Sequence, residues 1–87
     1  AILTVSDISA AVTLALHLAG VRPGDEVIAP PMLCLATSIP ILNLGARVAW
    51  ADVNPLTGML DPDAIAPLVS ARTKAILYYH WSGDAAA

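Results

Sequence analysis

The stretch Gly20–Pro30 (GVRPGDEVIAP) constrains the fold more than any other part of the sequence. Apolar residues at helical spacing precede it and stop at Gly20, which predicts a helix over roughly residues 9–19. A Pro-Gly pair typical of a turn follows the glycine. The short segment Glu26–Ala29, apolar from Val27 onward, then predicts a buried strand that ends at the next proline. A helix therefore turns directly into an interior strand.

The same alternation continues along the rest of the chain. In order, we expect a strand at Ile2–Val5, the helix over residues 9–19, a strand at Glu26–Ala29, a helix from about Cys34 or Ala36 to Leu44, a strand at Arg47–Asp52, a helix from Asp61–Pro62 to about Val69, and a strand at Lys74–His80. Strands that alternate with helices predict an α/β fold with a mostly parallel sheet and right-handed crossovers. Ligands of such sheets bind at the carboxyl ends of the strands.

The composition leaves too few polar side chains to cover a small domain. Of the 87 residues, 57% are apolar and 13% are charged, against about 45–50% and about 25% in ordinary globular domains. This balance suits a segment that is covered by the rest of a larger domain or by a tight oligomer. We expect residues 1–87 to be a piece of a longer protein that forms part of one domain, with no second domain in this chain.

Charge and cysteine content exclude several classes of function. The net charge is −3 with four basic residues, so no basic stripe is available to neutralise nucleic-acid phosphates. The single cysteine, Cys34, cannot form an intrachain disulfide and fits a reducing, cytoplasmic compartment. The uncharged run Val27–Ala46 has the length of a membrane span. It contains three prolines, which would break a spanning helix, so we expect no membrane segment.

The segment Ser6–Ala10 is the first candidate binding site. It lies between the first expected strand and the first expected helix, where amides and the positive end of the helix dipole can hold a phosphate. The alternative is that these residues form a plain N-cap, which the local sequence by itself favours. The glycines of dinucleotide and nucleoside-triphosphate motifs are absent, so those ligands are disfavoured.

Cys34 follows the second expected strand and His80 ends the fourth, so both lie at the edge where ligands gather. Cys34 is either a pocket residue at a helix start or a small buried apolar residue. His80 either lines a pocket or belongs to a half-buried pair with Trp81. One cysteine and two distant histidines do not have the spacing of metal ligands. Lys74 enters its strand at the amino end, so we do not assign it as a Schiff-base nucleophile.

Many short segments, in order and without large gaps, make the chain resemble the DegT/DnrJ/StrS family of pyridoxal-phosphate-dependent sugar aminotransferases. They are Ser9–Leu16, Gly20–Val21, Pro23–Ile28, Pro30, Ala36–Thr37, Leu44–Ala46, Ala51–Pro55, Thr57–Gly58, Leu60–Pro62, Thr73–Ile76 and His80–Gly83. The resemblance implies the three-layer α/β/α large domain of the type I, aspartate aminotransferase fold. It also implies that the Glu26–Ala29 strand lies between the third and fourth strands, and that Ile2–Val5 lies at a separate edge without neighbours.

The resemblance also assigns roles to single residues. Ser9 and Ala10 would hold the phosphate of pyridoxal 5′-phosphate (PLP), although Asp7 and Ile8 depart from the family pattern. Cys34 stands where many members have an aromatic residue that stacks on the pyridine ring, and His80 would form the pocket wall. The family's Schiff-base lysine and pyridine-nitrogen aspartate come later than this chain extends. We therefore expect cofactor-binding residues here and no catalytic residue.

For the intact protein, the resemblance implies transfer of an amino group from an amino acid, commonly glutamate, to a nucleotide-linked keto-sugar. It also implies a dimer with sites at the subunit interface. Two alternatives remain open at this point. One is a dehydratase-like relative that keeps the fold and changes the reaction. The other is a truncated, non-catalytic interaction or assembly module.

Overall fold

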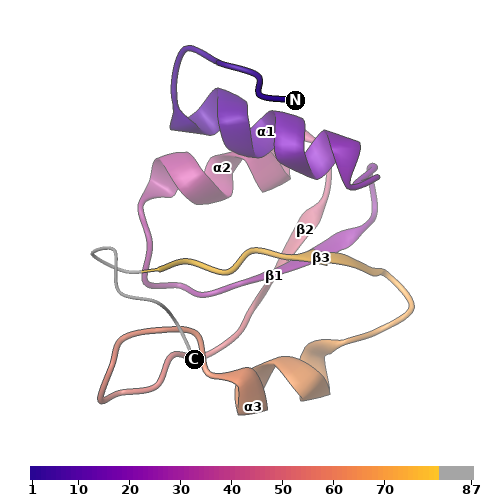
Figure 1. Cartoon of the computed structure of the whole chain (residues 1–87). Coiled ribbons are helices and arrows are strands. Elements are labelled where there is room, and N and C mark those ends of the chain that lie inside the picture. The colour runs from indigo at the N-terminus through magenta and orange to yellow at the C-terminus, as the bar shows by residue number, and fades with distance from the viewer. Residues whose placement is uncertain (81–87) are drawn as a thin grey trace.

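A parallel sheet lies between two helical layers in the computed structural model, which describes residues 1–80 (Figure 1). In chain order the elements are α1 (Ile8–Leu18), β1 (Glu26–Ala29), α2 (Leu35–Asn43), β2 (Arg47–Trp50), α3 (Pro62–Ile65), the 3₁₀ turn η1 (Ala66–Leu68) and β3 (Thr73–Ile76). Helices α1 and α2 cover one face of the sheet and α3 lies on the other (Figure 1). The three-layer α/β/α arrangement is confirmed.

The strand order is β2-β1-β3, and both pairings are parallel. The register aligns Glu26 with Arg47 of β2 and with Thr73 of β3, so the three strands start at the same edge. The predicted position of the Glu26–Ala29 strand, in the middle of the other two, is therefore confirmed. Parallel neighbours require crossover connections, which α2 and the segment of α3 and η1 supply.

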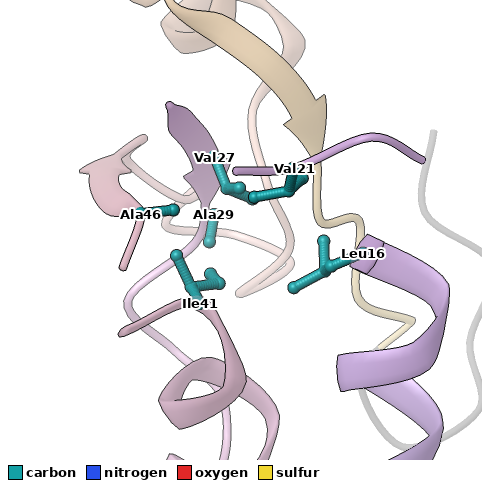
Figure 2. Packing of buried hydrophobic residues seen from close by; sticks show 6 residues of the cluster. All are labelled: Leu16, Val21, Val27, Ala29, Ile41 and Ala46. Carbon is teal, nitrogen blue, oxygen red and sulfur yellow. The ribbon is translucent and has the colours of Figure 1, made fainter. Parts of the chain in front are cut away.

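The central strand divides its side chains between two cores. Val27 and Ala29 pack with Leu16 of α1 and Ile41 of α2 in one cluster (Figure 2). Ile28 points to the opposite face and packs in a second cluster on the α3 side. All three residues are fully buried. This is why β1 is apolar from Val27 to Ala29: a strand covered on both faces needs no polar side.

All three strands end near Pro30, earlier than predicted for two of them. We expected strands over residues 47–52 and 74–80, whereas β2 stops at Trp50 and β3 at Ile76. Beyond Ala29, β1 continues into two consecutive prolines, which have no N–H to extend the ladder. The last bonds on the two sides run from Ala51 N to Ala29 O and from Leu77 N to Ile28 O. The ends of β2 and β3 are therefore set by their partner.

The predicted first strand, Ile2–Val5, is wrong for this structure. Residues 2–5 form no strand and are exposed, Ile2 to 96%. The prediction depended on a local apolar run, but a strand also needs a hydrogen-bonded neighbour. The sheet of residues 1–80 offers none at this place.

The predicted helices are found with small differences at their ends. The third helix is α-helical only over Pro62–Ile65, and residues 66–68 continue as a 3₁₀ turn. Pro67 explains the change, because its missing N–H cannot donate to the carbonyl of Asp63 in a continued α-helix. No helix within residues 1–80 has the length and apolarity needed to cross a membrane.

Candidate functional site

The carboxyl ends of the three parallel strands share one edge of the sheet, and the loops that follow them meet there. The loop after β1 carries Met32, and the loop after β2 carries Gly58. The two are close enough that a Cβ built on Gly58 would lie 3.3 Å from the Met32 Sδ. The loop after β2 is itself closed by an antiparallel bridge between Val53 and Leu60.

The N-terminus of α1 reaches this edge through one hydrogen bond. The Ser9 hydroxyl donates to the Ala36 carbonyl oxygen at 2.8 Å. Ala36 lies in the first turn of α2, directly after the loop that leaves β1. Two of the predicted cofactor segments, Ser9–Ala10 and Cys34, are therefore brought together at the carboxyl edge. The positive ends of two helix dipoles meet at the same place.

The first turn of α1 is capped by Asp7, which lies in the segment Ser6–Ala10 for which an N-cap was one of the two predicted roles. The Asp7 Oδ1 accepts a hydrogen bond from the Ala10 amide at 2.8 Å. This carboxylate occupies the position that an incoming anion would take on Ala10. The signal was present in the sequence, since aspartate is among the strongest N-cap residues and stands three positions before Ala10.

Cys34 is the N-cap residue of α2, with φ −70° and ψ 143°. Its side chain makes no capping hydrogen bond, and the residue is exposed. The alternative that Cys34 is a small buried apolar residue is therefore wrong. Its thiol lies on the surface of the carboxyl edge, two residues before the carbonyl that Ser9 binds.

His80 follows β3 and is exposed. Its ring is tilted against that of Tyr78, with the centroids 6.0 Å apart. The Tyr78 hydroxyl donates to the Leu60 carbonyl at 3.3 Å, which ties the chain after β3 to the loop after β2. Trp81, the expected partner of His80, and the rest of the Trp81–Gly83 segment lie outside the described residues.

The candidate site is an open surface at the carboxyl edge of the sheet. It comprises Ser9, Ala10, Cys34 and His80, and we call it the ledge. The described residues enclose no pocket. Within the same part of the chain, no group of three or more His, Cys, Asp or Glu side chains is arranged to hold a metal ion. Lys74 is exposed in β3, one residue after the start of the strand, near the amino edge of the sheet. The ledge can thus offer amides, hydroxyl and thiol to a ligand, but no lysine.

The sequence matches a known protein family over its whole length. A family model for the DegT/DnrJ/EryC1/StrS aminotransferases matches residues 1–87. The chain belongs to this aminotransferase family. It is 39% identical over 80 residues to the UDP-4-amino-4-deoxy-L-arabinose–oxoglutarate aminotransferase of Shewanella sediminis, a match that covers 92% of this chain and 21% of that protein. The chain thus spans about a fifth of the length of the curated relatives it matches.

Solved structures of other family members share the fold described above. The crystal structure of 3-amino-5-hydroxybenzoic acid synthase matches with a TM-score of 0.90 and 41% identity, over 93% of this chain and 21% of that one. The PLP form of the putative sugar aminotransferase Spr1654 from Streptococcus pneumoniae matches with a TM-score of 0.86 and 32% identity, over 91% of this chain and 20% of that one.

Proposed function

We propose that this chain is the N-terminal part of the large, cofactor-binding domain of a PLP-dependent aminotransferase. The intact protein would transfer an amino group from an amino acid, with glutamate as the first candidate, to a nucleotide-linked keto-sugar. The hydrogen bond from Ser9 to Ala36 is the observation that supports this most, because it brings the first turn of α1 beside Cys34 at the ligand edge. The relatives named above support the reaction class.

The residues at the ledge fit a phosphorylated pyridine. A phosphate dianion is favoured by the positive dipole ends of α1 and α2, and the first turn of a helix presents amides without intrahelical acceptors. We assign the phosphate to the turn at Ser9 and Ala10, the ring to the surface beside Cys34, and the pocket wall to His80. The Asp7 carboxylate must then turn away from the Ala10 amide, or be tolerated beside the anion. Once bound, the cofactor supplies the electron sink for amino transfer.

The part played by this chain is binding and orientation. Lys74, its only lysine, lies near the opposite edge of the sheet from the ledge. We therefore assign no covalent attachment and no catalytic residue to residues 1–87. A reducing, cytoplasmic location is consistent with a single exposed thiol.

We also propose that the intact protein is a homodimer. Helix α1 presents large apolar side chains to solvent at both ends, Ile8 and Leu18, which are 58% and 75% exposed. Neither α1 nor α2 contains Asp, Glu, Lys or Arg. Exposed apolar side chains on helices with few polar groups are typical of surfaces that another subunit covers.

Titration of the purified chain with pyridoxamine 5′-phosphate tests the cofactor site. This form has no aldehyde and so cannot react with Lys74. We expect saturable shifts of the backbone amide resonances of Ser9, Ala10 and Cys34 in ¹⁵N–¹H spectra. Pyridoxamine without the phosphate is the matched control and should bind much more weakly. Shifts scattered over the surface, or equal responses to both compounds, would contradict the site.

The reaction itself is tested with the intact protein. We expect the intact protein to aminate a nucleotide-linked keto-sugar in the presence of glutamate. Mass spectrometry of the product would detect the added amino group. Loss of a sugar hydroxyl without gain of an amino group would instead identify the dehydratase-like alternative.

A further inference from the structure

The carbonyl of Ala36 lacks the donor that a regular helix would give it. In an α-helix this oxygen accepts a hydrogen bond from the amide of residue 40. Residue 40 is a proline inside α2, and proline has no N–H. A proline ring in a helix also crowds the carbonyl four residues earlier, which here is that of Ala36. Pro40 is fully buried, so this ring is fixed by its packing.

The hydroxyl that takes the place of the missing amide comes from another helix. Ser9, in the first turn of α1, donates to the Ala36 carbonyl at 2.8 Å. A serine hydroxyl carries a single proton, so it cannot donate to this carbonyl and to a phosphate at once. If Ser9 turned toward a ligand, the Ala36 carbonyl would lose the donor that replaces the residue-40 amide.

We propose that Ser9 is a positioning residue and that Pro40 determines this role. By removing the helical donor of Ala36, Pro40 directs the Ser9 hydroxyl to that carbonyl. This bond fixes the first turns of α1 and α2 against each other at the ledge. One consequence rests on the proposed function. If the cofactor phosphate binds at the ledge, the backbone of the α1 turn holds it and the Ser9 hydroxyl does not.

A double-mutant cycle between positions 9 and 40 tests the coupling. In the parent chain, Ser9→Ala should lower the melting temperature by roughly 4–8 °C, the shift expected for one lost hydrogen bond in a domain of this size. In the Pro40→Ala background the amide of residue 40 can donate to Ala36, and the same change should have little effect. Ser9→Thr keeps the hydroxyl, so its melting temperature should be close to that of the parent chain.

Carbon-13 spectroscopy supplies a readout that general destabilisation does not give. The Ala36 carbonyl carbon should shift on Ser9→Ala in the parent chain, and much less in the Pro40→Ala background. Thr13→Ala is the matched control. The Thr13 hydroxyl also belongs to α1 and donates to the Ser9 carbonyl at 2.7 Å, a bond that does not involve residue 40. Its effect should be the same in both backgrounds.

The outcomes separate this inference from the proposed cofactor site. Equal effects of Ser9→Ala in both backgrounds, with no change at the Ala36 carbonyl carbon, would overturn the inference even if pyridoxamine phosphate binds at the ledge. Coupling without binding of that compound would support the inference and contradict the cofactor site. If Ser9→Ala alone fails to fold, recovery of folding in the double variant supports the inference, and failure of the double variant overturns it.

Discussion

A single backbone position, Gly45, holds the turn between α2 and β2 in a conformation that other residues rarely adopt. Its φ is +76°, and a Cβ placed there would lie 3.1 Å from the Pro23 Cβ. Pro23 cannot easily move away, because the neighbouring Gly24 amide donates to the Gly45 carbonyl at 3.0 Å. The turn that ends α2 and the turn before β1 are therefore packed as one unit.

Gly45→Ala should consequently be more destabilising than a matched change elsewhere. The left-handed backbone alone costs roughly 1–2 kcal/mol for an L-residue, and the contact with Pro23 adds to it. Gly20→Ala is the control, since Gly20 also has a positive φ, of +93°, but no atom within 4 Å of the added Cβ. Urea denaturation of the two variants measures the difference. Equal losses of unfolding free energy would show that the contact with Pro23 is relieved at no cost.

The bond between Ser9 and Ala36 shows what single residues in the sequence could and could not reveal. The hydroxyl of Ser9 and its place at a helix start were visible, and they predicted a role at the ligand edge. The partner was not visible, because it lies 27 residues away and depends on the effect of Pro40 on α2. The sequence likewise did not decide whether Cys34 is exposed or buried, because this depends on how the loop after β1 leads into α2.

At the scale of the element, the N-terminus of α1 has one feature that favours a bound anion and one that disfavours it. The dipole of α1 favours an anion, but Asp7 already supplies a negative charge that caps the Ala10 amide. The same kind of cap occurs at α3, where Asp61 accepts from the Asp63 amide at 2.9 Å. The two aspartates thus have the same structural task, and only Asp7 lies at the proposed phosphate position.

Asp7→Asn should raise the affinity for pyridoxamine phosphate by roughly twofold to fivefold, because a charge beside a helix terminus contributes about 0.3–1 kcal/mol. Stability should change little, since asparagine caps about as well as aspartate. Asp61→Asn is the control and should leave the affinity unchanged. Isothermal titration of the variants measures both effects. An unchanged or lowered affinity of Asp7→Asn would place the phosphate away from α1.

The strands also show why some bounds could be predicted and others could not. The bounds of β1, Glu26–Ala29, follow from the turn before it and the two prolines after it, which are all local. The ends of β2 and β3 depend on where β1 stops donating and accepting, so an apolar pattern that continued to Asp52 or His80 was misleading. Residues 2–5 failed as a strand for the same reason, because a strand is defined by its partner.

At the scale of the whole molecule, the order of the sheet was predictable and the outer surface of the helical layer was not. The order β2-β1-β3 followed from the resemblance to a known fold. The composition predicted that the rest of a larger domain or an oligomer covers the chain, but it did not say which surface is covered. In this chain Ile8 and Leu18 of α1 face solvent, 58% and 75% exposed, and we propose that another subunit covers them.

Ile8, Ala11, Ala15 and Leu18 form a stripe along α1 with the spacing i, i+3, i+7, i+10; Ala11 is half-buried and the other three are exposed. The side chains along this stripe are large, small, small and large, so their order of size is the same when it is read from either end. Two copies of α1 that pack antiparallel about a twofold axis would place Ile8 of one copy against Leu18 of the other, with the alanines between them. An interface of this kind is self-complementary, as a twofold dimer requires.

If the proposed twofold contact forms through this stripe, Leu18→Lys should weaken the self-association of the chain. Lysine near the end of α1 is favourable to the helix dipole, so the helix itself should be kept. Leu56→Lys is the control, because Leu56 is 93% exposed in the loop after β2 and lies outside the stripe. Sedimentation velocity over a range of concentrations measures the dissociation of each variant. If both variants associate like the parent chain, the stripe is not the dimer surface, and the exposed edges of β2 or β3 become the stronger candidates because their backbone groups are open to pairing.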